Sequence, residues 1–253
     1  MIVRMILLKK LKTLPAFNFN VLNRDAWIAS QAMELPKGSR VLDAGAGSCP
    51  YRACFSHCEY QTQDFTNLQG EQLSGGQYGE MDYICDIASV PVEDGSFDAV
   101  LCSEVLEHVA DPVKVVQEFA RILKPGGTLF LSAPLGSGIH QEPYHYYGGY
   151  TPFWYEKYLT EAGFEHISVE SNAGSLQACA QESMRFIQLS RPFKLGMPLW
   201  AELLWLPLWL LLLPFMAVAA PVFSHMLRSY DKNRDFTIGY HVTAKRAGVT
   251  AKE

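Results

Sequence analysis

The side chains most able to do chemistry gather around a glycine turn. Residues 41–47 read Val-Leu-Asp-Ala-Gly-Ala-Gly, a buried strand running into a turn. Glycine allows positive φ and lets a ligand approach bare backbone, so Gly45 and Gly47 can form a ligand-binding turn. Pro50 suits the first turn of a helix that would follow. Because a glycine pair alone is weak evidence, the acid before it, Asp43, strengthens the case.

Two more carboxylates end predicted strands. Asp64 closes a strand over residues 60–64, about twenty residues past the turn, where nucleotide-binding α/β folds hold a ribose. Asp86 closes a strand over residues 81–86 and is well placed for an adenine amino group. Strands alternate with helical patterns, which predicts a parallel, doubly wound sheet with its ligand outside the carboxyl ends of the strands.

Histidines are the first candidates for a general base, because an unperturbed imidazole has a pKa near neutrality. His108 follows the fourth predicted strand, while His140 and His145 lie in the loop after the fifth. Both places border the ligand site expected at the carboxyl ends of the strands. The same loop is rich in tyrosines that either line this pocket or pack over the sheet edge, namely Tyr144, Tyr146, Tyr147 and Tyr150.

Two groups of side chains have metal-ligand types. On a helix, Glu104, Glu107 and His108 would share one face, and they could hold a divalent cation or only cap and pair locally. Cys54 and Cys58 could suggest zinc, but no second ligand pair follows at finger-like spacing. The sequence therefore assigns no metal ligands, leaves the cation at Glu104, Glu107 and His108 as an open alternative, and favours reduced thiols for its six cysteines.

Five motifs, taken together and in order, resemble those of class I S-adenosylmethionine-dependent methyltransferases, most closely the ubiquinone- and menaquinone-biosynthesis type. They are Asp-Ala-Gly-Ala-Gly at 43–47, Asp64, Cys-Asp-Ile at 85–87, the strand and helix start over 96–109, and Leu-Lys-Pro-Gly-Gly-Thr-Leu at 123–129. The resemblance covers residues 36–171 and 237–246. It implies a Rossmann-like α/β fold whose doubly wound sheet has seven strands, the last one antiparallel.

The resemblance implies S-adenosyl-L-methionine as the cofactor. Seven motif residues would bind it: Asp43, Gly45 and Gly47 around the methionine half, Asp64 at the ribose, Asp86 and Ile87 at the adenine, and Ser103. Cys49 departs from the family pattern, since relatives often carry a third glycine there. An NAD-type site is the alternative for the glycine turn. The acid before the first glycine and the Lys-Pro-Gly-Gly turn at 124–127 argue against it.

A second feature is the hydrophobic segment over residues 199–223, since no charge occurs between Glu202 and Arg228. A helix of this length reaches roughly 30 Å or more, enough to span a bilayer. However, the strands predicted on either side, at 164–170 and 238–245, pair in one sheet in the family fold, so the segment crosses an even number of times or not at all. Three prolines would kink or break the helix. We expect a re-entrant or interface-lying helical hairpin between strands six and seven.

The sequence divides into three predicted parts. Residues 1–35 form an N-terminal basic, helical extension without a secretory cleavage site. Residues 36–171 and 237–246 form the cofactor-binding domain, and residues 172–236 form the hydrophobic insertion. The net charge of −5 argues against nucleic acid as a partner. We expect the chain in the cytoplasm, peripheral or re-entrant at the membrane.

These features predict a methyltransferase that acts on a hydroxyl or acidic carbon of a lipid, a quinone precursor or a lipid-linked acceptor at the membrane surface. Strand six is expected to run parallel, so the insertion would leave the sheet at the cofactor edge and hold the methyl donor against lipid. Two alternatives stay open. One is a soluble methyltransferase of a small metabolite, with the insertion as a homodimer interface or lid. The other is a cofactor-binding membrane adaptor without catalysis.

Overall fold

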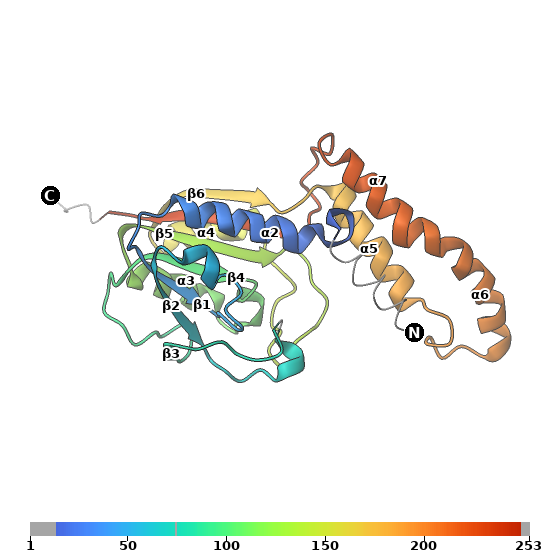
Figure 1. Cartoon of the computed structure of the whole chain (residues 1–253), viewed down its shortest axis with the longest axis horizontal. Coiled ribbons are helices and arrows are strands. Elements are labelled where there is room, and N and C mark those ends of the chain that lie inside the picture. Colours follow the sequence, from blue (N-terminus) through green and yellow to red (C-terminus); the bar gives the residue numbers. More distant parts are fainter. Residues whose placement is uncertain (1–13, 74, 249–253) are drawn as a thin grey trace. The chain divides into compact units, whose positions relative to one another are not determined.

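The computed structural model describes residues 14–73 and 75–248 (Figure 1). The predictions made for residues 1–13 lie outside this range. The described residues form two compact units, one from residues 24–73, 75–170 and 239–248 and the other from residues 14–23 and 171–238. We call the first the sheet unit and the second the helical arm, and each is described by itself.

The sheet unit is built on seven strands in the order β3-β2-β1-β4-β5-β7-β6. Their bounds are β1 Arg40–Ala44, β2 Glu59–Asp64, β3 Tyr83–Ile84, β4 Phe97–Ser103, β5 Leu123–Pro134, β6 Phe164–Ser171 and β7 Gly239–Arg246. β1 pairs in parallel with β2 and β4, and β4 with β5, whereas β7 is antiparallel to β5. This arrangement confirms the Rossmann-like fold with an antiparallel last strand.

The central strands are apolar because both faces of the sheet are covered. On one face, Leu42 and Val100 pack into a core with helix α3 (Pro112–Ile122) and helix α4 (Pro152–Glu161). On the other face, the alternate residues of these strands pack against the second half of helix α2 (Pro15–Glu34), through Ile28, Ala32, Val41 and Leu101. Figure 1 shows α2 lying along the sheet.

Helix α4 begins as the sequence predicts. Its N-cap Thr151 accepts a hydrogen bond from the Trp154 amide at 3.4 Å, and Pro152 occupies the first turn. The start of α3 uses the same device, since Asp111 accepts from the amide of Lys114. These caps fix where the loops after β4 and β5 end.

The helix expected after the glycine turn does not form. Pro50 lies in a turn, and only a short 3-10 helix, η1 (Arg52–Phe55), precedes β2. The connection is too short for a helix. Because a helix rises about 1.5 Å per residue, a helix over residues 48–58 would need all of them to run back along the length of one strand. Cys49, at the position of the missing third glycine, takes a left-handed φ of 55° and turns the chain early. A second short 3-10 helix, η2 (Gly70–Gln72), follows β2.

The helical arm contains the hydrophobic segment, but not as the expected hairpin within residues 199–223. Residues Leu199–Leu227 form one continuous helix, composed of α6 (Leu199–Pro214), the π-helical turn η4 (Phe215–Ala219) and α7 (Ala220–Leu227). Helix α5 (Ser175–Leu189) packs against all three parts. The hairpin therefore consists of α5 and the long helix.

The prolines of the long helix do not break it, and at Pro221 the π turn and helix α5 satisfy the affected backbone groups. The Ala220 amide bonds the Phe215 carbonyl across the wider π turn. The next carbonyl, that of Met216, would be the π partner of Pro221, which has no N–H. Ser183 of α5 donates its hydroxyl to this carbonyl instead, at 2.8 Å.

Two tryptophans of the long helix have a role inside the arm. The indole N–H of Trp205 donates to the Ser190 carbonyl at 2.7 Å, and that of Trp209 donates to the Ile187 carbonyl at 3.1 Å. They satisfy carbonyls at the end of α5, where a helix lacks partners of its own. Trp200, by contrast, is 69% exposed.

Candidate active site

The predicted ribose carboxylate lies at the carboxyl end of β2. The Oδ2 atom of Asp64 accepts a hydrogen bond from the Gly47 amide at 3.0 Å, and its Oδ1 atom accepts from the Thr66 amide, also at 3.0 Å. The Tyr78 hydroxyl also interacts with the Asp64 carboxylate, which leaves an acceptor position for a ligand hydroxyl. Asp86 follows β3 with an exposed carboxylate that accepts from the Ala88 amide at 2.9 Å.

The two glycines of the turn serve different purposes. At Gly45, with φ of 76°, an added Cβ would lie 2.4 Å from a γ-methyl of Val105, so the close approach of a side chain requires glycine there. At Gly47, with φ of 52°, an added Cβ would meet only Leu73, at 3.7 Å. The second glycine therefore leaves open backbone next to Asp64, as a ligand site needs.

Asp43 lies buried at the end of β1. Its carboxylate accepts a hydrogen bond from the hydroxyl of Tyr60. Burial raises the pKa of Asp43 to about 7, and the nearby Asp64 carboxylate adds to this, whereas the Tyr60 hydrogen bond opposes it. This hydrogen bond ties the end of β1, just before the glycine turn, to β2.

A cation that the sequence motifs did not indicate stands at the same sheet edge. Arg24, on the part of α2 that belongs to the sheet unit, has its Nη1 atom 3.4 Å from Oε2 of Glu104, and its Nε donates to the Tyr51 hydroxyl at 3.1 Å. Glu104 also accepts from Ser132 at 3.0 Å, and the Ser132 hydroxyl lies 2.9 Å from that of Ser103. The predicted cofactor residue Ser103 therefore belongs to a network that contains Arg24.

Glu104, Glu107 and His108 do not share one helical face, contrary to the prediction. Glu104 has a left-handed φ of 56° just after β4, and only residues Leu106–His108 form a 3-10 helix, η3. Three-ten geometry spreads neighbouring side chains around the axis. As a result Glu104 faces Arg24, whereas Glu107 lies near His108.

The three predicted histidines come together. Their ring centroids lie 4.7 Å apart for His108 and His140, 5.7 Å for His108 and His145, and 4.8 Å for His140 and His145. The Nδ1 atom of His108 donates to the Tyr144 carbonyl at 2.5 Å, and Nδ1 of His140 donates to the Gly138 carbonyl at 2.9 Å. These bonds fix the tautomers and leave both Nε2 atoms as acceptors.

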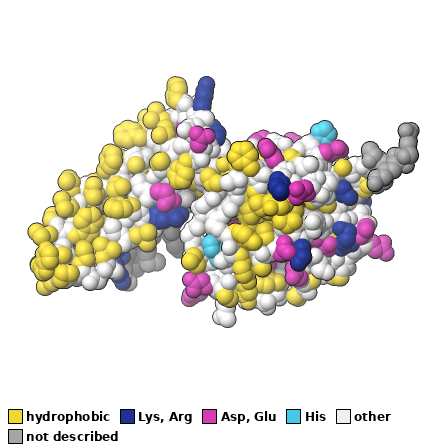
Figure 2. All heavy atoms as spheres, turned by 180° about the vertical axis from the view of Figure 1, so that it is seen from behind, with side chains coloured by type: hydrophobic (Ala, Val, Ile, Leu, Met, Phe, Trp, Pro, Cys, Tyr) yellow, Lys and Arg dark blue, Asp and Glu magenta, His cyan; other side chains and the backbone are white. Residues whose placement is uncertain are grey.

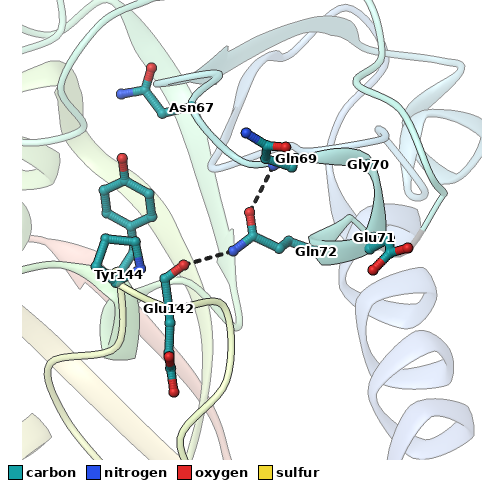
Figure 3. Close-up of a pocket in the computed structure, with 8 residues that line it drawn as sticks. Asn67, Gln69, Gly70, Glu71, Gln72, Glu142 and Tyr144 are labelled. Carbon is teal, nitrogen blue, oxygen red and sulfur yellow. Dashed lines mark hydrogen bonds between the residues drawn. The ribbon is translucent and has the colours of Figure 1, made fainter.

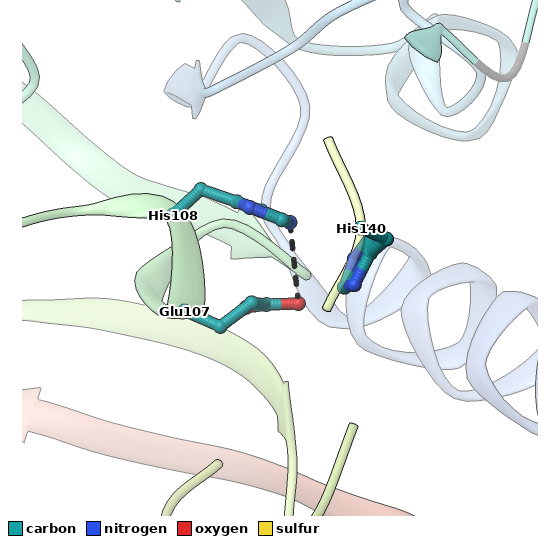
Figure 4. A group of neighbouring side chains, drawn as sticks. All are labelled: Glu107, His108 and His140. Atoms are coloured by element: carbon teal, nitrogen blue, oxygen red, sulfur yellow. Dashed lines mark ion pairs between the residues drawn. The ribbon is translucent and has the colours of Figure 1, made fainter. Parts of the chain in front are cut away.

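Electrostatics keep His108 neutral. Burial lowers its pKa to about 4, and the neighbouring imidazoles of His140 and His145 lower it further, against the hydrogen bond to Tyr144. Glu107 beside it is 2% exposed; burial and the charge of Glu104 raise its pKa to about 8. The two side chains, 3.8 Å apart (Figure 4), are thus a neutral pair near pH 7, with the proton on Glu107.

Glu107, His108 and His140 also offer three ligand atoms within 4.8 Å of one another (Figure 4). In the part of the chain that the structure describes, no other group of three such side chains lies this close, so Cys54 and Cys58 do not form a metal site with His57. The His57 ring instead donates to the Leu35 carbonyl at 3.2 Å.

The comparisons with known proteins agree with this geometry. Residues 42–131 match the family model described as a methyltransferase domain. The chain contains a class I S-adenosylmethionine-dependent methyltransferase domain. The ubiquinone biosynthesis O-methyltransferase of Xanthomonas oryzae pv. oryzae is 62% identical over 104 residues, 38% of this chain and 43% of that protein. Its counterpart from Dechloromonas aromatica is 37% identical over 131 residues, 47% and 53% of the two chains. The chain thus spans about half the length of these relatives.

Solved structures share the fold of the methyltransferase domain. A putative sarcosine dimethylglycine methyltransferase from Galdieria sulphuraria superposes with a TM-score of 0.54 at 17% identity, covering 89% of this chain and 86% of that one. Phosphoethanolamine N-methyltransferase 2 of Haemonchus contortus gives 0.51 at 19% identity, covering 89% and 52%. At such identities the likeness concerns the fold.

Proposed function

We propose that the protein transfers a methyl group from S-adenosylmethionine to a hydroxyl of a lipid, quinone precursor or lipid-linked acceptor at a membrane surface. The observation that carries the proposal is the cluster of three histidines, with a neutral His108, at the carboxyl edge of a methyltransferase sheet. An acceptor hydroxyl needs a base, and imidazole acceptors with free Nε2 atoms supply one.

The cofactor half of the proposal rests on the groups around the glycine turn. Asp64 accepts from a ribose hydroxyl, and Asp86 with the buried Ile87 holds the adenine. Gly45 and Gly47 frame the methionine half. Arg24 is positioned to receive the methionine carboxylate, in exchange for part of its contact with Glu104. S-Adenosylmethionine supplies the activated methyl group.

The chain's own contribution to the reaction is alignment and proton removal. Nε2 of His108 accepts the hydroxyl proton, while the Tyr144 carbonyl keeps the imidazole in the required tautomer. Neutral Glu107 leaves the site without a buried negative charge that would compete for that proton. Holding donor and acceptor in line contributes several kcal/mol of the barrier reduction.

The membrane half of the proposal rests on the surface of the helical arm. The helix Leu199–Leu227 has a mean hydropathy of 2.2 and is, among the described residues, the one helix long and apolar enough to cross a bilayer. Its most apolar stretch contains no buried residue, and Figure 2 shows hydrophobic side chains crowded over the arm. An apolar surface of this kind needs a partner, which a lipid surface provides.

Charges at the two ends of the long helix favour a lipid surface with anionic head groups. Arg191 and Lys194 lie exposed before the helix, and Arg228 is exposed after it. Helix α5, the other helix of the arm, carries an ion pair of 3.4 Å between Glu182 and Arg185. An apolar helix with basic residues at both ends suits a position in the plane of the interface.

Chain connectivity links the arm to the acceptor loop. The chain re-enters the sheet at Gly239, which pairs with Pro134 at the end of β5. The loop with His140 and His145 starts from the same strand end. An arm bound to lipid would therefore be tethered at the edge of the sheet where methyl transfer takes place.

The proposal is tested with S-adenosylmethionine carrying a labelled methyl group and an extract of the cells that make the protein. Enzyme-dependent label in the organic phase is the expected result. Label confined to the aqueous phase would instead support a soluble methyltransferase whose arm is a packing or dimer element. Intact S-adenosylhomocysteine binding without any label would favour the non-catalytic adaptor.

A further inference from the structure

A polar pocket opens beside the predicted cofactor residues. It has a volume of about 630 Å³, within the range of small-molecule sites, and two loops line it (Figure 3). The loop after β2 contributes residues 67–72 with the exception of Leu68, and the loop after β5 contributes residues 142–144. None of the predicted cofactor residues lines it.

The two loops that line the pocket also contact both halves of the candidate active site. The Thr66 amide, next to Asn67, is bound to Asp64, the predicted ribose acceptor. The carbonyl of Tyr144 is bound to Nδ1 of His108, the candidate base. The walls of the pocket are therefore hydrogen-bonded both to Asp64 at the predicted cofactor site and to His108, the candidate base.

The walls of the pocket are tied together by side-chain amides. Nε2 of Gln72 donates to the Glu142 carbonyl at 2.9 Å (Figure 3), and Nε2 of Gln141 donates back to the Gln72 carbonyl at 2.8 Å. Gln72 also accepts from the Gln69 amide at 2.8 Å. These hydrogen bonds join the two loops and hold the wall of the pocket in place.

The free polar groups of the pocket suit hydroxyls. Within the described residues, the structure records no hydrogen bond for the Asn67 side chain or the Tyr144 hydroxyl, and Figure 3 shows the Tyr144 hydroxyl directed toward Asn67. An amide and a phenol each donate and accept, as a hydroxyl does. The tyrosine ring adds an apolar face for C–H groups.

The charges of the pocket exclude an anionic ligand. Its described lining contains two carboxylates, Glu71 and Glu142, and no lysine or arginine. A phosphate or carboxylate would find no cation there and two negative charges nearby. An extended apolar group would find only Pro143 and the Tyr144 ring.

We propose that this pocket holds an uncharged, polyhydroxylated ring, so that the acceptor of the methyl group is a glycosyl unit of a lipid-linked molecule. This inference rests on the proposed function and narrows its substrate class. A ring hydroxyl oxygen attacks the methyl carbon of the sulfonium, the carbon–sulfur bond breaks with its electrons going to sulfur, and the hydroxyl proton passes to Nε2 of His108. The products are an O-methyl sugar and S-adenosylhomocysteine.

The part of the product that carries the labelled methyl group tests the glycosyl assignment separately from the methyltransferase function. The organic phase from the labelling reaction is hydrolysed in acid, which releases sugars from their lipid carriers but leaves O-methyl ethers intact. We expect the label to move to the aqueous phase as an O-methyl monosaccharide. Label that stays in the organic phase after hydrolysis would overturn the glycosyl assignment while the methyltransferase function stands. No label before hydrolysis, with S-adenosylhomocysteine still bound, would overturn both.

Variants of the free pocket groups provide a second test. Asn67→Ala and Tyr144→Phe should each raise KM for the labelled lipid fraction about tenfold, the change expected for the loss of a hydrogen bond to a substrate hydroxyl. S-Adenosylhomocysteine affinity should stay unchanged. Glu156→Gln, an exposed site on α4, is the matched control. A loss of S-adenosylhomocysteine affinity with an unchanged KM would assign the pocket to the cofactor and overturn the inference.

Discussion

The Nδ1 atom of His108 lies 2.5 Å from the carbonyl oxygen of Tyr144. Because a carbonyl only accepts, the imidazole carries its proton on Nδ1 and presents Nε2 as a base. This single contact joins the end of β4 to the loop after β5, and it sets the protonation state on which the proposed chemistry depends.

The first prediction concerns this base. Replacing His108 with Asn should lower kcat about 10²- to 10⁴-fold, the usual contribution of a general base. S-Adenosylhomocysteine affinity should remain the same, as measured by calorimetry. Because the pKa of His108 is about 4, the wild-type rate should be constant between about pH 5 and 7. A rate that instead rises through pH 6.5 would assign the base to a less perturbed group.

A second prediction follows from buried groups whose pKa values differ between the folded and unfolded states. Burial raises the pKa of Glu107 to about 8 and that of Asp43 to about 7, so the folded state binds more protons and stability falls as pH rises toward 8. Burial lowers the pKa of His108 and His241 to about 4, so stability rises with pH from about 4 to 6.5. Above pH 6.5 only the acids still titrate.

Stability should therefore fall between pH 6.5 and 8. Urea unfolding at a series of pH values measures this, and Glu107→Gln should flatten the fall because it cannot ionise. A Glu156→Gln control should keep the wild-type slope. An unchanged slope in Glu107→Gln would contradict the raised pKa of Glu107.

The third prediction concerns metal. Glu107 must lose its proton to bind a cation, and with a pKa of about 8 it resists this near neutrality. We expect activity at pH 7 to survive dialysis against a chelator. Loss of activity that magnesium or zinc restores would show that Glu107, His108 and His140 hold a metal during the reaction.

The fourth prediction concerns Arg24. Arg24→Gln removes the cation proposed for the methionine carboxylate and leaves Glu104 without its ion-pair partner. S-Adenosylhomocysteine affinity should fall roughly 10- to 100-fold, as expected for a charged hydrogen bond of about 1.5–3 kcal/mol. Arg40→Gln, which removes a half-exposed arginine of β1, is the control. Equal affinities in the two variants would rule out the proposed role.

The sequence predicts the parts of this molecule that local pattern determines. Asp64 ends β2 and Thr151 caps α4 because strand ends and N-caps depend on residues a few positions away. The helix after the glycine turn was predicted wrongly, since the left-handed φ of Cys49 and the short connection prevailed over Pro50. Arg24 could not be found from the motifs, because only the tertiary packing of α2 brings it to Glu104.

The hydrophobic segment was predicted as a hairpin for a related reason. Its prolines do interrupt the hydrogen-bond ladder, but the partner that replaces one lost bond, Ser183, comes from another helix. No pattern within residues 199–223 contains that information. The histidine cluster, in contrast, was predictable in outline because strand ends meet at one edge of a parallel sheet.

The last prediction concerns the helical arm, first its internal packing and then its proposed membrane surface. Ser183→Ala removes the hydrogen bond to Met216 and should destabilise the arm by about 1–3 kcal/mol, seen as faster amide exchange in η4 and α7. Ser190→Ala is the matched control, because the Ser190 hydroxyl is buried with no recorded partner within the described chain. Its exchange should match the wild type.

Membrane binding should depend instead on the exposed face of the long helix. Leu204 and Leu211 are 65% and 72% exposed, and replacing both with Glu places two charges where lipid is expected. Flotation with anionic vesicles should be lost, because a buried charge costs up to about 3 kcal/mol in the bilayer. Leu176→Glu, on α5, should still float. Flotation of the double variant would leave the exposed leucines without a lipid partner and favour a second copy of the chain as their cover.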